Sequence, residues 1–244
     1  MKKIEVIGVS SRYEELQVID DISLFAEQNE LVSILGPSGC GKSTLFNIIS
    51  GLIKPDGGKV LIDGQEHTGK LGRVSYMHQK DLLFPWRNII DNVCIPLVIK
   101  GESIEQARSK ADKYFGVFGL QGFEDKYPFQ LSGGMRQRAA LLRTYMSKSD
   151  IMLLDEPFGG LDAITKRKMQ EWLLGIIHRL NSTILFITHD IDEAIFLSDR
   201  IYLFTERPAS VSRVFSVNIE RPRGNKTFTS DRFNSLKESI LEYL

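Results

Sequence analysis

The sequence predicts an α/β fold with a parallel central sheet, an N-terminal antiparallel β region and an inserted α-helical region. A short apolar run at 31–35 stops at a glycine-rich loop and is followed by a helical pattern, as expected of a buried strand. Apolar runs at 151–154 and 183–187 flank a helical pattern over about 163–180. A strand–helix–strand unit of this kind implies parallel pairing of its strands.

The remaining segments predict where the antiparallel β region and the α-helical region lie in the chain. Extended patterns at 4–9 and 18–25, and a strand pattern at 59–64 after a Pro-Asp-Gly-Gly turn, predict the antiparallel region. Charged amphipathic patterns at 104–119 and from Ser132 to Tyr145 predict helices. We therefore expect residues 1–244 to form one domain, with residues 1–79 and 149–244 as its core and about 80–148 as a helical subdomain.

Composition excludes several classes of protein. The chain has 244 residues, with 31 basic and 31 acidic side chains, so its formal net charge is zero. The net charge therefore gives no overall electrostatic attraction to nucleic acid. No apolar run approaches the roughly 18–20 residues that cross a bilayer, and the N-terminal lysines precede no signal-peptide core. Cys40 and Cys94 form no CxxC pair, which favours a reducing cytosol.

A phosphate-binding loop follows the first apolar strand. The segment matches the pattern GxxxxGK[ST] and consists of Gly36, Pro37, Ser38, Gly39, Cys40, Gly41, Lys42, Ser43 and Thr44. Glycines let backbone N–H groups point at phosphates, and the start of the helix adds its positive dipole end. Lys42 can reach the β- and γ-phosphates and Ser43 can bind Mg²⁺. A chance glycine-rich turn would lack the strand before and the helix after it, so the pattern indicates a P-loop NTPase core that binds ATP and Mg²⁺.

Two carboxylates end the apolar strand at 151–154. In a parallel sheet the carboxyl end of a central strand lies beside the phosphate loop, which would bring Asp155 to the Mg²⁺ ion. Glu156 would then act as the general base on the attacking water. Alone, this acidic pair could equally be two solvated carboxylates that cap the next segment. The phosphate loop is what favours the catalytic interpretation.

A third segment narrows the class of ATPase. Residues 131–138 read LSGGMRQR, which resembles the LSGGQ signature of ABC (ATP-binding cassette) ATPases, here formed by Leu131, Ser132, Gly133, Gly134 and Met135. A serine and two glycines that open a helix can form a second anion site, although such a segment by itself is also an ordinary helix cap. Met135 stands where the family usually has glutamine, which removes one polar contact and leaves the serine and glycines intact.

Further positions match the same family one by one. The resemblance implies that Gln79 senses the metal and the nucleotide, that Leu161 and Asp162 form a D-loop crossing to a partner subunit, and that His189 is the switch histidine at the γ-phosphate. Tyr13 lies in the region that stacks on adenine, although an aromatic residue in an N-terminal strand is more often core. Gly160 stands where Ser or Ala is commoner.

The resemblance also implies partners and a location. In this family two cassettes close head to tail around ATP, most commonly as a homodimer, beneath membrane-spanning permease subunits at the cytoplasmic face of the membrane. An extracytoplasmic solute-binding protein would supply the cargo, and no nucleic acid is expected. Segments 82–88, 206–209 and 221–223 resemble the branch that imports nitrate, taurine, alkanesulfonates and thiamine precursors.

Three other functions are possible for a chain with a phosphate loop, and each is less consistent with this sequence than import. A non-transport ABC ATPase acting on nucleic acid or ribosomes usually carries coiled-coil arms, zinc motifs or a second cassette. A small-molecule kinase leaves the signature and the His189 segment unexplained, and a non-catalytic module leaves Lys42, Asp155 and Glu156 unexplained. The aromatic turn Phe84-Pro85-Trp86 is either an exposed knob for a permease or is packed under the helical region.

Overall fold

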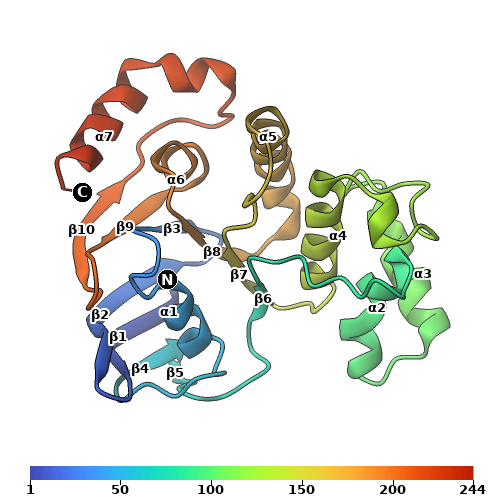
Figure 1. The fold of residues 1–244 in the computed structure, drawn as a ribbon, viewed down its shortest axis with the longest axis horizontal. Helices are drawn as coiled ribbons and strands as arrows, with labels where there is room; N and C mark the ends of the chain where they lie inside the picture. Colours follow the sequence, from blue (N-terminus) through green and yellow to red (C-terminus); the bar gives the residue numbers. More distant parts are fainter. Residues whose placement is uncertain (244) are drawn as a thin grey trace.

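The structure is a computed structural model that describes residues 1–243, and the side chains of these residues except 178–180. Two sheets and the helices around them make up the chain (Figure 1). In chain order the elements are β1 (Lys2–Tyr13), β2 (Leu16–Glu27), β3 (Leu31–Leu35), α1 (Lys42–Ile49), β4 (Gly57–Ile62), β5 (Gln65–Glu66), β6 (Ser75–Met77), α2 (Ile89–Ile99), α3 (Ile104–Phe115), η1 (Pro128–Gln130), α4 (Gly133–Tyr145), β7 (Ile151–Asp155), α5 (Ala163–Leu180), β8 (Thr183–Thr188), α6 (Ile191–Leu197), β9 (Arg200–Phe204), β10 (Val211–Ser216), η2 (Asn225–Thr229) and α7 (Asp231–Leu241).

The larger sheet has six strands in the order β10-β9-β3-β8-β7-β6, and neighbouring strands are parallel except at the β10–β9 pair. Strands β3, β7 and β8 are buried along their whole length. Both faces of a parallel sheet are covered, so such strands carry apolar residues without alternation. The predicted parallel central sheet is therefore present, and its carboxyl ends point toward the phosphate loop.

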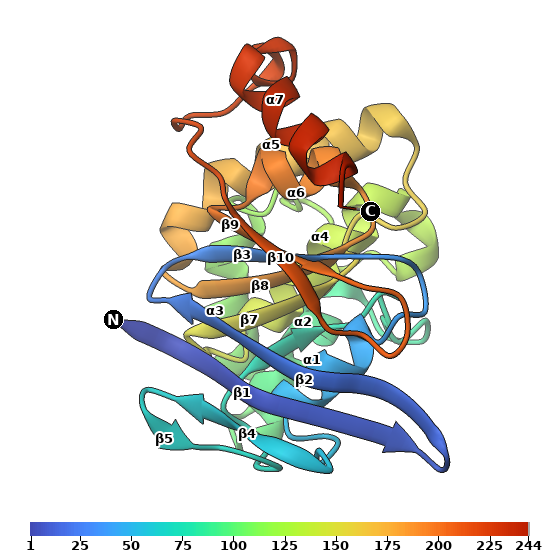
Figure 2. The ribbon, with the colours of Figure 1, turned by 90° about the vertical axis from the view of Figure 1, so that its left-hand side faces the viewer.

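The smaller sheet is antiparallel, in the order β2-β1-β4-β5. Figure 2 shows its long strands β1 and β2 running past the parallel sheet, with α1 on its inner side. Apolar side chains of α1, among them Leu45 and Phe46, are buried in one cluster with Val6 of this sheet and Ile34 of the parallel sheet. Helix α1 is thus fixed between two sheets, which holds the loop that precedes it.

The opposite face of the parallel sheet packs against α4, α5 and α6. Along β3 the side chains alternate, so that Leu31 and Leu35 enter this second cluster while Val32 and Ile34 enter the first. Helices α2, α3 and α4 lie together beyond β6 and β7, on the side away from α1 (Figure 1). No helix within residues 1–243 combines the length and the apolar composition that spanning a bilayer would need.

Several elements differ from the sequence prediction. Strands β1 and β2 each have 12 residues and are longer than the predicted runs. Helix α2 was not predicted, because Pro96 lies inside it and interrupts its pattern. The elements from α6 to α7 were also unassigned. Predicted helix starts agree well: Ser132 and Asp162 accept hydrogen bonds as N-caps of α4 and α5.

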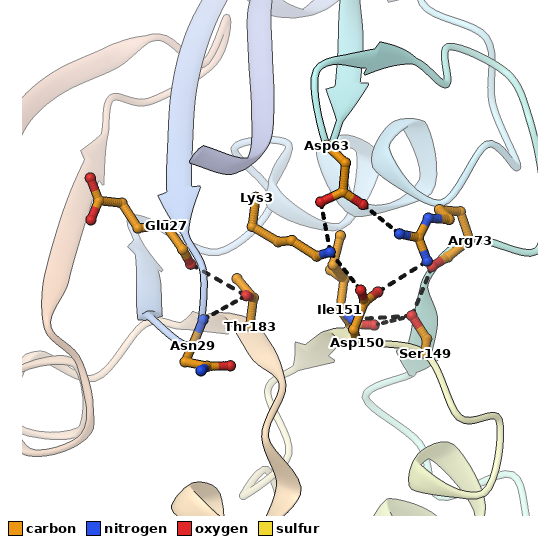
Figure 3. A network of polar contacts seen from close by, with 9 residues as sticks. All are labelled: Lys3, Glu27, Asn29, Asp63, Arg73, Ser149, Asp150, Ile151 and Thr183. Carbon is orange, nitrogen blue, oxygen red and sulfur yellow. Dashed lines mark hydrogen bonds and ion pairs between the residues drawn. The ribbon is translucent and has the colours of Figure 1, made fainter. Parts of the chain in front are cut away.

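A ring of ion pairs joins the two sheets at the amino ends of β6 and β7 (Figure 3). Lys3 Nζ lies 2.7 Å from Asp63 Oδ1 and 2.5 Å from Asp150 Oδ2, and Arg73 bridges the same two carboxylates. Hydrogen bonds to Lys3 and Arg73 lower the pKa of Asp63 against a smaller opposing effect of burial. Burial lowers the pKa of Lys3, but its bonds to Asp150 and Asp63 outweigh this and leave it raised. The ring lies away from the carboxyl ends of the strands and therefore supports the fold rather than the chemistry.

Candidate functional site

The phosphate loop connects the end of β3 to the first residue of α1. Gly41, the N-cap of α1, has φ of 129°, and a Cβ there would lie 3.0 Å from Cγ1 of Val18. Gly39 has φ of 77°. Both positions therefore need glycine, because other residues rarely adopt this conformation. The N–H groups at the start of α1 have no intrahelical partners, which makes the loop an anion site.

Lys42 holds this loop from within. Its side chain is buried, and Nζ donates to the carbonyl oxygens of Gly36 at 2.8 Å and Pro37 at 2.7 Å. The ammonium is therefore already inside the loop, where it could transfer these bonds to phosphate oxygens. Cys40 is also buried, with Sγ 4.0 Å from Lys42 Nζ.

Asp155 and Ser43 meet where β7 ends. Asp155 is 5% exposed and accepts hydrogen bonds from the Ser43 hydroxyl and, at 3.3 Å, from the Tyr76 hydroxyl. Burial raises the pKa of Asp155, the hydrogen bonds from Ser43 and Tyr76 oppose the rise, and the charge of Glu156 adds to it. Burial also raises the pKa of Tyr76. A cation bound nearby would stabilise the ionised form of this buried carboxylate.

This pair of oxygen donors suits Mg²⁺. Among residues 1–243, no group of three or more His, Cys, Asp or Glu side chains is arranged to hold a metal ion. Magnesium commonly binds through one or two protein oxygens together with substrate phosphates and water. Asp155 and Ser43 therefore fit an ion that arrives with a nucleotide.

Glu156 lies between two residues from distant segments. Oε2 of Glu156 accepts a hydrogen bond from Gln79 Nε2 at 3.0 Å, and Oε1 lies 3.1 Å from His189 Nδ1. Its backbone has φ of 44°, in the left-handed region, and its N–H donates to Ile187 at the end of β8. Glu156 is thus in direct contact with Gln79 and with His189, the other two residues predicted as catalytic. A carboxylate held this way, next to a phosphate loop, could accept a proton from water.

A buried polar network fixes Thr188 and Asp190, the residues on either side of His189. Glu193 is 4% exposed and accepts hydrogen bonds from Thr188 Oγ1 at 2.5 Å and Gln170 Nε2 at 3.2 Å. Lys166 Nζ lies 2.7 Å from Glu193 and 2.9 Å from Asp190. Burial raises the pKa of Glu193, and its bonds to Lys166 and Thr188 oppose the rise. Sequence reasoning missed this network, whose only local signal is an acid three residues after the Asp190 N-cap.

A cavity of about 390 Å³ opens beside the phosphate loop. The residues lining it are Tyr13, Leu16, Val18, Ser38, Gly39, Gly41, Lys42, Ser43, Thr44, Gln79, Glu156 and Arg207. Tyr13 is 48% exposed, so it lies at the rim of the cavity and not in the core. Arg207 was noted in the sequence only as part of a family-like segment, and the structure brings it to this cavity.

The signature and D-loop residues lie elsewhere, and none of them lines this cavity. Ser132 is exposed and accepts a hydrogen bond from the N–H of Met135 as the N-cap of α4. A Cβ on Gly133 would lie 3.2 Å from Leu161, and one on Gly134 would lie 3.0 Å from Thr165, so both glycines permit close packing on the start of α5. Asp162 is occupied as the N-cap of α5. Helix α4 and helix α1 lie on different sides of β6 and β7 (Figure 1).

The fold and the loop together define the class of protein. A parallel α/β sheet with a GxxxxGK[ST] loop between its strand and helix, and a carboxylate at the end of a neighbouring strand, is the arrangement of a P-loop NTPase.

Comparison with known proteins gives the family. The family described as "ABC transporter" matches residues 19–159. An aliphatic sulfonates import ATP-binding protein of Bacillus cereus is 37% identical over 98% of this chain and 94% of its own. A formylaminopyrimidine import ATP-binding protein of Halalkalibacterium halodurans is 46% identical over 78% of this chain and 74% of its own. The solved dimeric structure of a bacterial ABC transporter cassette superposes with a TM-score of 0.77 at 31% identity, covering 89% of this chain and all of that one.

The chain therefore belongs to the ABC transporter family, as one of its ATP-binding and ATP-hydrolysing cassettes. The predicted resemblance and the predicted fold class are confirmed.

Proposed function

We propose that the chain powers the import of a small anion or organic solute of the nitrate, sulfonate, taurine or pyrimidine class. The position of the signature outside the ATP cavity carries the proposal that two cassettes work together, because Lys42 lines that cavity and Ser132, the N-cap of α4, does not. Each ATP would lie between the phosphate loop of one cassette and the signature of the other. The dimeric structure of a similar cassette and the import proteins among the relatives support this assignment.

The site residues would share the work of hydrolysis. Lys42 and the loop N–H groups would bind the phosphates, and Ser43 and Asp155, with Gln79, would hold Mg²⁺. Glu156 would accept a proton from the attacking water, and His189 would contact the γ-phosphate. Loss of the γ-phosphate would weaken the contact between the two cassettes and open the pair.

An exposed aromatic knob, formed by Phe84 and Trp86, would contact the permease. The two rings stack with centroids 5.1 Å apart, and Trp86 is 71% exposed. Buried Asn92 fixes the turn beneath them, since its Nδ2 donates to the carbonyl oxygens of Phe84 and Arg87 and its Oδ1 accepts from the N–H of Phe84. A rigid exposed aromatic pair is typical of an interaction surface.

A groove next to the knob would complete this contact. It has a volume of about 550 Å³ and lies between the segment after Gln79 and helices α2 and α4; its lining residues include Leu82, Leu83, Phe84, Ile95, Pro96 and Thr144. We propose that residues 80–148 act as one subdomain that passes the closing motion from Gln79 to the permease. The permease would hold the chain at the cytoplasmic face of the membrane, and an extracytoplasmic solute-binding protein would deliver cargo.

The test is co-purification. A tagged chain is isolated from gently solubilised native membranes, alongside the variant Trp86→Ser and the control variant Trp172→Phe, which changes a partly buried tryptophan outside the knob. We expect a multi-span membrane protein in stoichiometric amount with the wild type and the control, and less of it with Trp86→Ser at unchanged basal ATPase activity. A ribosome, DNA or a soluble partner in its place would refute import and favour the non-transport alternative.

A further inference from the structure

Arg207 belongs to a loop between β9 and β10 that is pinned against the nucleotide side of β2. Ala209, fully buried, donates its N–H to the carbonyl oxygen of Val18 at 2.9 Å and accepts from the N–H of Asp20 at 2.9 Å. Within the loop, Thr205 and Ser210 exchange hydrogen bonds, including Thr205 N–H to the Ser210 carbonyl at 3.0 Å. The backbone that carries Arg207 is therefore fixed beside the cavity before any ligand binds.

The guanidinium of Arg207 reaches the phosphate loop. Its Nη2 donates to the carbonyl oxygen of Gly39, and the side chain lines the cavity together with Lys42 and Tyr13. No ion pair found in the described part of the chain includes Arg207. An arginine has five N–H donors, so one bond to Gly39 leaves most of them available to a ligand.

We infer that Arg207 is a nucleotide-binding residue that steadies the phosphate loop through Gly39 and supplies a positive charge to the phosphates of ATP. A guanidinium without a carboxylate partner, in a cavity that also holds Lys42, raises the positive potential where the phosphates bind. Its planar donors match phosphate oxygens, and charge-assisted bonds of this kind are stronger than neutral ones. This inference rests on the nucleotide site proposed above, and the loop lies outside residues 19–159, which match the family.

The two contributions of Arg207 can be separated by choice of variant. Arg207→Gln removes the charge and keeps a shorter side chain with N–H donors, Arg207→Lys keeps the charge without the planar donors, and Arg207→Ala removes both. Arg213→Ala is the matched control, because Arg213 is an exposed arginine on β10 whose guanidinium lies 4.6 Å from the Tyr243 ring.

The experiment measures dissociation constants of the purified chain for ATP, ADP and adenosine by calorimetry. We expect Arg207→Ala to weaken the binding of ATP and ADP about ten- to hundredfold, which is the range for hydrogen bonds to charged groups. The affinity for adenosine should not change, and Arg213→Ala should bind all three ligands like the wild type. Arg207→Gln should lose most of the same affinity, and Arg207→Lys should lose less. Thermal unfolding of each variant checks that the fold is intact.

Three results would overturn the inference. ATP affinity of Arg207→Ala equal to wild type means that Arg207 does not bind nucleotide. If Arg207→Ala loses as much affinity for adenosine as for ATP, Arg207 does not act on the phosphates. If Arg207→Gln binds ATP as tightly as the wild type, the charge of Arg207 does not contribute to binding. Lys42→Ala tests the site itself: if it leaves ATP affinity unchanged, the nucleotide site is wrong, whatever Arg207 does.

Discussion

Replacement of Glu156 by Gln isolates the proton-accepting role of this side chain. Glutamine has the same length as glutamate, and like glutamate it has a Cβ and an unbranched side chain, so the backbone at φ of 44° holds the same kind of residue. Its amide oxygen can accept from Gln79 Nε2, and its NH₂ can donate to His189 Nδ1 when the imidazole proton sits on the other nitrogen. The contacts around residue 156 can therefore persist while the base is lost.

The size of the effect follows from the role. General-base catalysis contributes about 10²–10⁴-fold, so the barrier should rise by roughly 3–5 kcal/mol. ATP affinity should change little, since the phosphates are held by Lys42 and the loop and not by Glu156. The variant should consequently accumulate with ATP bound, and pairs of cassettes joined by ATP should become detectable.

Single-turnover hydrolysis of radiolabelled ATP measures the rate, and sedimentation with ATP measures the pairing. Glu66→Gln is the matched control, because it makes the same change of charge on an exposed side chain in β5. Hydrolysis by Glu156→Gln within about threefold of the wild-type rate would refute the assignment of Glu156 as base. A rate that falls together with ATP affinity would instead assign the residue to binding.

Three further predictions concern the same site. Lys42→Ala should abolish measurable ATP binding, because the buried ammonium is the charge within the loop; calorimetry that still detects tight binding would contradict the loop's role. A bulky thiol reagent on Cys40, which is 2% exposed, should block ATP binding, and bound ATP should protect the thiol; mass spectrometry paired with activity checks this, and full activity after stoichiometric modification would refute it. Asp155→Asn should raise Tm of the nucleotide-free protein near pH 7, since burial raises the pKa of Asp155. The stability given by the protonated form is complete below the unfolded value of 3.8 and is lost as pH rises through the folded value, so the advantage of Asn should vanish in acid; an equal Tm at pH 7 would contradict this.

The sequence alone was sufficient for the local motifs. The phosphate loop, the acidic end of β7 and the starts of helices α4 and α5 are set by a few consecutive residues each. Their geometry depends on backbone rules for glycine, helix starts and buried strands, which apply wherever the segment lies. The same rules predicted the parallel sheet, because uniformly apolar strands that alternate with helices have few other arrangements.

Only the tertiary structure decided which distant segments meet. Gln79 and His189 contact Glu156 from the segments that follow β6 and β8, Lys166 on α5 pairs with Glu193 on α6, and Arg207 contacts Gly39 from 168 residues away. Such contacts depend on how the elements pack and on the exact lengths of their connections, and neither leaves a periodic signal in the chain. For the same reason the sequence left open whether Trp86 is exposed, a question of packing that local propensity does not answer.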